Sequence, residues 1–208
     1  MRYGLEVESF VVNENEEVVI PPTNLPVDEF PLIIEARGRP RRNIREAVYS
    51  VLAERERIKN RLKGTGLHLS SRSTFPKDQE LYHELMKGRT ITKSIDWSNM
   101  YGELPDRNTW YAGIHVSFTD ERSMTVGNET RTYNGMWNFM ELFIRLEKEF
   151  EKDITGADRV PGMYELKGNG RIEYRSLPVH LINDPELLIK RLNLCRLRVN
   201  ERPDNYEI

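Results

Sequence analysis

The sequence predicts an α+β domain with helices packed on one face of a largely antiparallel β-sheet. Segments with the period of a strand and segments with the period of a helix follow one another in mixed order. Hydrophobic residues make up 38% of the 208 residues and occur in every long segment, which is enough for a packed core. Since no linker or low-complexity tract divides the chain, we expect a single domain over residues 1–208.

The first part of the chain has the pattern of short strands. Residues 4–12 alternate on a two-residue period, which is typical of a strand. Polar residues 13–16 predict a turn, so residues 17–20 are expected to return as the second strand of a hairpin. Four prolines interrupt residues 21–31 and predict a loop, and residues 30–37 form a short β-rich run.

The middle of the chain begins with a strongly predicted helix. Apolar residues recur at three- and four-residue spacing over residues 43–62, and Asn43 is suited to cap the helix. Residues 66–70 predict another short strand. Residues 71–108 have little periodicity apart from a possible small helix at 78–86. Loops of this length are usually functional, so this segment is expected to be a lid or a recognition surface.

The last part of the chain alternates strands and helices. A strand is predicted at residues 109–118 and an amphipathic helix at residues 134–152. A second strand follows at residues 171–177. The final helix is expected at residues 185–197, with Asp184 as its cap and a proline at its first position.

Charge and cysteine content exclude several classes of protein. The formal net charge is −2, so a general electrostatic attraction to nucleic acid or acidic membranes is not expected. No run approaches the roughly 20 apolar residues of a membrane span, and the first residues do not form a secretion signal. One cysteine, Cys195, excludes an internal disulfide framework and fits a reducing compartment. We therefore expect a cytoplasmic protein.

The usual sequence signatures of a catalytic site are missing, and carboxylates on strands remain. The chain has no phosphate-binding glycine loop, no HExxH, no CxxC and no GxSxG motif. Glu6 and Glu8 are two residues apart and project from the same face of their strand. Two adjacent carboxylates repel each other, and a divalent cation with hard oxygen ligands relieves that repulsion. The alternative is a solvent-exposed sheet face that carries two glutamates.

A second strand places Glu173 between two arginines on one face, with Arg171 and Arg175 beside it. This arrangement indicates either a structural ion-pair group or a metal ligand next to cations for phosphate or carboxylate. Glu35 ends an apolar run, and His115 lies on the strand face opposite its apolar neighbours. Each of these two residues has an ordinary structural interpretation when it is considered alone.

Taken together, these segments resemble the carboxylate–amine ligase superfamily, whose best-known branch is glutamate–cysteine ligase. The resemblance is strongest to the short phage-encoded amidoligases. It rests on the following motifs: Leu5-Glu6-Val7-Glu8-Ser9-Phe10, Ile34-Glu35-Ala36-Arg37, Ala112-Gly113-Ile114-His115-Val116, Gly162-Met163-Tyr164-Glu165-Leu166-Lys167 and Gly170-Arg171-Ile172-Glu173-Tyr174-Arg175. The resemblance implies a curved antiparallel sheet backed by helices, as in glutamine synthetase and glutamate–cysteine ligase, and a protein of the host cytoplasm.

The resemblance also implies an ATP- and Mg²⁺-dependent enzyme that joins a carboxylate to an amine through an acyl phosphate. The two substrates would be small molecules, peptides or proteins, and neither nucleic acid nor a membrane is an expected partner. The implied metal ligands are Glu6, Glu8, Glu35, His115 and Glu173, with Asp28 as a weaker candidate and His115 alternatively a phosphate contact. Arg175, with Glu173, is the implied catalytic residue at the transferring phosphoryl group, and Arg171 and Lys167 would hold nucleotide or substrate carboxylate.

Two positions depart from the family pattern. Ser117 stands where many relatives have a second histidine, and Glu165 stands where the phage group has arginine. These departures keep two alternatives open, namely a non-catalytic binding module of the same fold and a metal-dependent phosphohydrolase. Trp97, Tyr101 and Trp110 are candidates for stacking on adenine or a peptide, or for hydrophobic docking.

Overall fold

The computed structural model describes residues 2–28, 30–87, 98–119, 129–167 and 171–197. The strands are β1 (Arg2–Val12), β2 (Ile33–Arg37), β3 (His68–Leu69), β4 (Thr74–Pro76), β5 (Ser98–Asn99), β6 (Thr109–Tyr111), β7 (Ile114–Thr119), β8 (Met163–Lys167) and β9 (Arg171–Leu177). The helices are α1 (Ile44–Leu62), α2 (Gln79–Met86), α3 (Glu129–Gly156) and α4 (Pro185–Leu197), with a short 3₁₀ helix, η2 (Val179–Asn183). This α+β composition confirms the predicted class.

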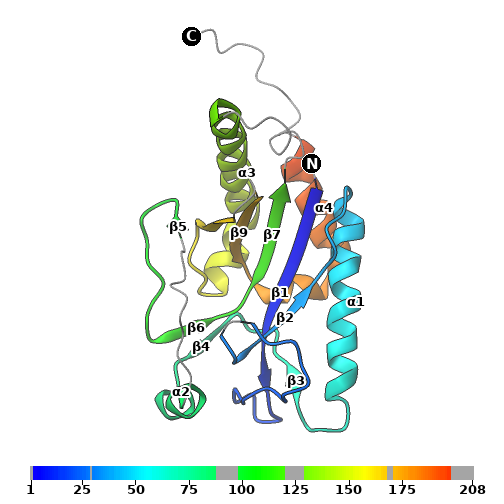
Figure 1. The fold of residues 1–208 in the computed structure, drawn as a ribbon, viewed down its shortest axis with the longest axis vertical. Helices are drawn as coiled ribbons and strands as arrows, with labels where there is room; N and C mark the ends of the chain where they lie inside the picture. The colour runs from blue at the N-terminus through cyan, green and yellow to red at the C-terminus, as the bar shows by residue number, and fades with distance from the viewer. Residues whose placement is uncertain (1, 29, 88–97, 120–128, 168–170, 198–208) are drawn as a thin grey trace.

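The long first strand lies inside a seven-stranded sheet (Figure 1). The strand order is β2-β1-β7-β9-β8-β5, and β3 pairs with the far end of β1. All of these pairings are antiparallel. The strands β4 and β6 form a separate two-stranded sheet. As predicted, the main sheet is antiparallel.

One face of the sheet is apolar and is covered by helices. Alternate residues of β1, namely Tyr3, Leu5 and Val7, are buried on this face. The helix α1 packs against β1 and β2, α3 packs against β9, and α4 packs against both α1 and α3 (Figure 1). Because side chains alternate along a strand, the intervening residues of β1 project from the opposite face.

Helix starts follow the predicted capping residues. Asn43 accepts a hydrogen bond from the Arg45 amide and begins α1, as expected. Asp78 caps α2 in the same way, and Asp184 accepts a bond from the Leu187 amide at 3.0 Å. The helix α3 is longer at both ends than the predicted 134–152.

The predicted strand 109–118 is wrong in one respect, because it consists of two strands that belong to different sheets. Between β6 and β7, the Ala112 amide donates to the Ser73 carbonyl at 2.8 Å, and Gly113 accepts from the Glu8 amide at 2.9 Å. The Arg159 guanidinium fills the space beside this break, and a Cβ on Gly113 would lie only 2.6 Å from it. Contacts with distant residues therefore end β6 and redirect the chain into β7.

Other differences from the prediction lie near turns. Residues 17–20 do not form a full return strand, and only Val18 makes an isolated bridge, with Val12. The Asn13 side chain shapes the turn before them, because it accepts hydrogen bonds from the backbone amides of Asn15 and Glu17. The run predicted from residue 30 becomes a strand only at residue 33.

The segment 71–108 was expected to have little regular structure. The small helix predicted at residues 78–86 is confirmed as α2. The described part of the segment also contains β4 and β5, which were not predicted, and residues 88–97 lie outside the described residues. The strand β8 was not predicted as a strand.

Candidate functional site

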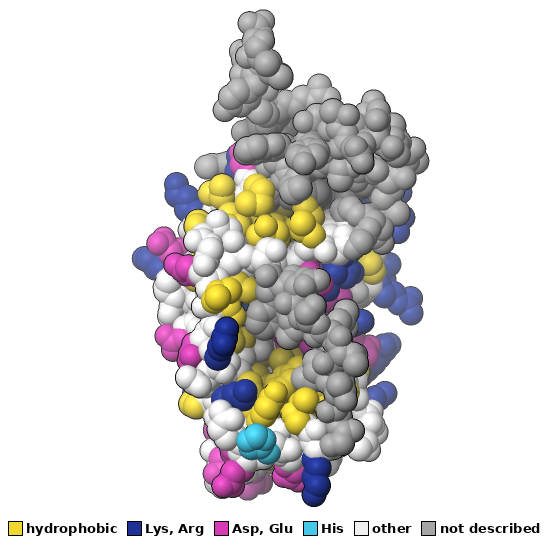
Figure 2. Space-filling model, turned by 60° about the vertical axis from the view of Figure 1, so that its left-hand side comes forward, with side chains coloured by type: hydrophobic (Ala, Val, Ile, Leu, Met, Phe, Trp, Pro, Cys, Tyr) yellow, Lys and Arg dark blue, Asp and Glu magenta, His cyan; other side chains and the backbone are white. Residues whose placement is uncertain are grey.

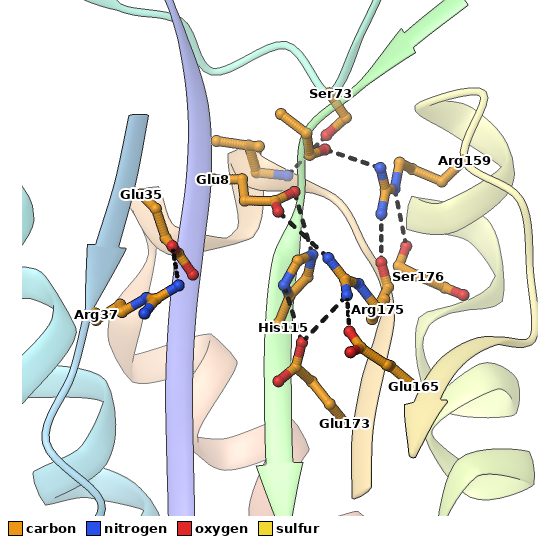
Figure 3. A network of polar contacts seen from close by, with 12 residues as sticks. Glu8, Glu35, Arg37, Ser73, His115, Arg159, Glu165, Glu173, Arg175 and Ser176 are labelled. Carbon is orange, nitrogen blue, oxygen red and sulfur yellow. Dashed lines mark hydrogen bonds and ion pairs between the residues drawn. The ribbon is translucent and has the colours of Figure 1, made fainter. Parts of the chain in front are cut away.

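The sheet face opposite the helices collects charged side chains from five strands. Register explains the grouping, since Glu6 lies opposite both Arg37 and His115, and Glu8 lies opposite Glu35. On the other side of β7, Glu173 lies opposite Glu165. The charged residues on this face are Glu6, Glu8, Glu35, Arg37, His115, Glu165, Lys167, Arg171, Glu173 and Arg175. Figure 3 shows seven of them, namely Glu8, Glu35, Arg37, His115, Glu165, Glu173 and Arg175. The structure thus places the predicted metal-ligating, catalytic and nucleotide-binding residues of the strands on one face of the sheet.

His115 lies between two buried carboxylates. Its Nε2 atom is 3.2 Å from Glu8 Oε2, and its Nδ1 atom is 3.3 Å from Glu173 Oε1 (Figure 3). Only 2% of His115 is exposed. Burial alone lowers the pKa of this imidazole, but the charge of Glu8 and the hydrogen bonds with both glutamates raise it to about 9. His115 is therefore a buried cation at neutral pH.

Glu173 is an ionised carboxylate at the centre of the cluster. Burial raises its pKa, but the hydrogen bond and charge of His115 and the charge of Arg175 outweigh burial and lower the pKa to about 2. Arg171 lies 3.5 Å from Glu173 Oε2. No residue among those described donates a hydrogen bond to this buried oxygen. An ionised oxygen with unused acceptor capacity is suited to contact a cation.

Glu6, His115 and Glu173 each bring one ligand atom to a common point, with the three atoms within 4.8 Å of one another. Glu35 makes a hydrogen bond with Glu6 and an ion pair of 2.6 Å with Arg37. Burial, with the neighbouring Glu6, raises the pKa of Glu35 to about 7 against the opposing effect of Arg37. The Glu35 carboxyl is therefore partly protonated near neutral pH, and its hydrogen bond with Glu6 keeps the two side chains together.

The carboxylates of this group fit Mg²⁺. Carboxylate oxygens are the ligands that Mg²⁺ prefers, whereas imidazole suits softer metals. Glu6 and Glu173 are thus the best-placed oxygen ligands, and Glu35 lies beside them. Glu8 is directed to His115 and Arg175. This geometry favours His115 as a counter-charge or phosphate contact over its other predicted role as a metal ligand.

Arg175 lies among three carboxylates at the edge of the cluster. It is 3.5 Å from Glu8 and 3.6 Å from Glu173, and it donates a hydrogen bond to Glu165. Lys167 also contacts Glu165, at 2.5 Å. One side chain, Glu165, therefore neutralises two of the cations that the sequence assigned to phosphate or substrate.

Asp28, the weaker candidate, lies close enough to act on the same site. The hydrogen bond with Glu35 raises the pKa of Arg37, and the charge of Asp28 adds to this effect. For Arg175, burial lowers the pKa, and the charges of Glu8, Glu173, Glu165 and Asp28 together raise it. The loop before β2 thus contributes negative charge to the cluster.

Two arginines of the site were missed. Arg37 pairs with Glu35 and could have been found, because residues two apart on a strand share a face. Arg159 follows α3 in a loop, and no periodic pattern marks it. It is buried and donates to the carbonyls of Ala112, Arg175 and Ser176.

The aromatic candidates have different surroundings. Trp110 is buried, with its ring centroid 6.4 Å from Phe10 and 6.3 Å from Phe30, so its role as an exposed stacking platform is not supported. Tyr101 is exposed, and Trp97 lies outside the described residues. The serine at position 117 packs against Gly4. A Cβ atom added to Gly4 would lie only 2.4 Å from Ser117 Oγ.

The described surface has no dominant charge on the side drawn in Figure 2, where basic and acidic side chains are interspersed around apolar groups. Among the described helices, none combines the length and the apolar character needed to cross a membrane.

Comparison with protein-family models, with curated proteins and with solved structures finds no significant match for this chain.

The pKa of His115 predicts how stability depends on pH. Because the folded value of about 9 exceeds the ordinary 6.5, the stabilisation is complete below pH 6.5 and is lost as the pH rises through 9. In the presence of a chelator, we expect the free energy of unfolding to fall by on the order of 3 kcal/mol across this range. Urea titrations at several pH values measure the slope. His115→Gln should remove most of it, whereas the exposed control His68→Gln should keep it; equal slopes in both variants would contradict the assignment.

Proposed function

We propose that this protein is an ATP- and Mg²⁺-dependent ligase that joins a carboxylate to an amine. The observation that carries the proposal is the juxtaposition, on one sheet face, of buried acids suited to a divalent cation with cations suited to phosphate. The acids Glu6 and Glu173 lie at the point shared with His115, and Arg171 and Arg175 adjoin it. The family resemblance of the same residues supports this interpretation, including the finer similarity to the glutamate–cysteine ligase fold.

The proposed reaction needs neutralised negative charge more than it needs an enzyme nucleophile. The carboxylate substrate attacks the γ-phosphorus of ATP, the bond to ADP breaks, and an acyl phosphate forms. The amine then attacks the acyl carbon, loses a proton and displaces phosphate. Bound Mg²⁺ would supply charge neutralisation at the phosphate oxygens. Glu6, Glu35 and Glu173 would hold it, and a cation among them would relieve the repulsion between these neighbouring carboxylates.

The basic residues have separate tasks in this proposal. Arg175 is a planar donor that stabilises the equatorial oxygens of the phosphoryl group during transfer. Arg171 and Lys167 lie opposite each other on the neighbouring strands β9 and β8, and they bind the remaining anionic groups. His115 holds Glu8 and Glu173 in place and keeps a positive charge beside them. No serine or cysteine nucleophile is required, which agrees with the buried position of Cys195 in α4.

The direct test is ADP release in the presence of Mg²⁺ and a panel of carboxylates and amines. We expect ADP release that requires one partner from each class and yields an amide. Nucleotide hydrolysis that is indifferent to the amine would instead indicate a phosphohydrolase.

One observation favours a second candidate, a binding module of the same fold that no longer turns over nucleotide. Glu165 already neutralises Arg175 and Lys167, which weakens the attraction for a triphosphate. Such a module predicts no ADP release with any pair of substrates, even where the folded protein binds nucleotide.

Removing the charge of Glu165 should strengthen nucleotide binding. In Glu165→Gln, Arg175 and Lys167 lose their shared counter-charge, so we expect the Kd of a non-hydrolysable ATP analogue with Mg²⁺ to fall about tenfold, or about 1.4 kcal/mol. Isothermal titration calorimetry measures this change, with Glu151→Gln on the exposed side of α3 as the matched control. Weaker binding in Glu165→Gln would contradict the role of Glu165 as an internal neutralising group.

A further inference from the structure

A small cavity opens beside the charged cluster, next to the buried Arg159. Its volume is about 40 Å³, and the side chains that line it include Arg159, Arg175, His115 and Glu8. Figure 3 shows Arg159 reaching from the segment after α3 toward β7 and β9, close to Arg175. The cavity therefore adjoins the proposed phosphoryl-transfer residue and is bordered by a residue that the proposed function does not use.

Arg159 is a buried charge whose hydrogen-bond partners are all neutral, and its one described carboxylate neighbour with a marked electrostatic effect is Glu8. Its three hydrogen bonds go to the main-chain carbonyls of Ala112, Arg175 and Ser176. A guanidinium has more N–H groups than these three acceptors use. Among the described residues, no carboxylate forms an ion pair with Arg159. A buried charge without a direct ion pair is costly, and Glu8 offsets this cost only from a distance, so this position favours the entry of an anion.

The charges around the cavity also favour an anion. Its only lining carboxylate is Glu8 among the described residues. Glu8 is already contacted by His115 at 3.2 Å and Arg175 at 3.5 Å. The lining thus carries three cationic side chains and one carboxylate. Arg175 and His115 are shared with Glu165 and Glu173, which do not line the cavity, so Arg159 is the lining cation without a direct ion pair among the described residues.

The size and the walls of the cavity select the kind of anion. About 40 Å³ holds a group the size of a few water molecules, which suits a carboxylate and excludes a triphosphate. Pro105, Val160 and Met163 provide apolar walls, and Tyr111 lies under Arg159, with its ring centroid 5.8 Å from the guanidinium carbon. Apolar walls beside a guanidinium fit a short aliphatic chain that ends in a carboxylate.

We propose that this cavity binds the carboxylate group of a small aliphatic acid, held by Arg159 and directed toward Arg175. Its assignment as the donor substrate rests on the proposed ligase function, because the acid would lie next to the residue that contacts the transferring phosphoryl group. Binding of the acid itself depends on neither nucleotide nor metal.

Saturation-transfer NMR on the aliphatic protons of butyrate, without nucleotide or Mg²⁺ and at constant ionic strength, tests the proposal. We expect transfer to wild type with millimolar affinity. Val160→Phe fills the cavity and leaves Arg159 in place, and it should weaken binding at least about tenfold. Leu187→Phe on the exposed side of α4 is the matched control and should bind as wild type does.

Arg159→Gln should also lose butyrate binding, but this substitution removes three hydrogen bonds and can unfold the protein. The Val160→Phe variant is therefore the one that tests the proposal. No transfer to folded wild type, or equal transfer to Val160→Phe, would overturn the proposal. Inorganic phosphate that displaces butyrate at a lower concentration than acetate does would assign the cavity to phosphate and would also overturn it. Nucleotide binding is measured separately, so its failure with butyrate binding intact would contradict only the ligase function.

Discussion

A Glu173→Gln protein is expected to keep its fold and lose Mg²⁺-dependent binding of ATP. Glutamine preserves the size of the side chain but removes the negative charge that faces the common point with Glu6 and His115. In the wild type, the lowered pKa keeps Glu173 ionised at all pH values above about 2, so the charge is always available to a metal. We expect the Kd of a non-hydrolysable ATP analogue with Mg²⁺ to rise at least about 100-fold, or about 2.8 kcal/mol.

Calorimetric titrations with and without Mg²⁺ measure this effect, and circular dichroism confirms that the variant is folded. Glu56→Gln, on the exposed side of α1, makes the same chemical change away from the site and should bind as wild type does. Unchanged Mg²⁺-dependent affinity in folded Glu173→Gln would remove Glu173 from the site. An absence of nucleotide binding to wild type would instead favour a protein that recognises other partners.

Local patterns predicted the side chains that share a strand. The two-residue period placed Glu6 and Glu8 on one side of their strand, and Arg171, Glu173 and Arg175 on one side of theirs, and the structure has both groups as expected. Such predictions succeed because the direction of a strand side chain is fixed by backbone geometry over a few residues.

Strand order and register could not be derived in the same way. That β1 lies between β2 and β7, and that Glu173 lies beside His115, depends on pairings between residues far apart in the sequence. The break between β6 and β7 depends on Ser73 and Arg159, which lie far from it in the chain. The role of Arg159 is hidden for the same reason, because a loop residue carries no periodic signal.

The grouping of charged residues on this face is also not visible from any single strand. Each strand alone has an ordinary interpretation as an exposed polar edge. Only when the strands are assembled do Glu8, His115 and Glu173 become a buried carboxylate–imidazole–carboxylate arrangement. Even a paired buried charge contributes little net stability, and clusters of buried ionisable groups occur often at functional sites, which is consistent with the proposed function.

Arg175→Lys is expected to slow the chemical step while leaving nucleotide bound. Lysine keeps the positive charge that Glu8, Glu165 and Glu173 require, so the acid cluster should remain ordered. It lacks the planar guanidinium, which can donate to two equatorial oxygens of a transferring phosphoryl group at once. We expect the single-turnover rate of ADP formation to fall about 10³-fold, with the Kd of the ATP analogue changing by less than about tenfold.

The variants Glu173→Gln and Arg175→Lys therefore separate the two roles that the proposed function gives to this sheet face. Arg57→Lys, at an exposed pair with Glu54 on α1, is the control for the arginine change and should leave the rate unaltered. If Arg175→Lys turns over as fast as wild type, charge alone suffices, and donor geometry at position 175 has no catalytic part. If instead Arg175→Lys and Glu173→Gln each lose nucleotide binding, both residues serve to hold the nucleotide. Arg171 or Lys167 would then be the candidate for stabilising the transferring phosphoryl group. The expected result, binding without turnover, requires a guanidinium beside the acid proposed to bind the metal, and β9 carries Glu173 and Arg175 two residues apart.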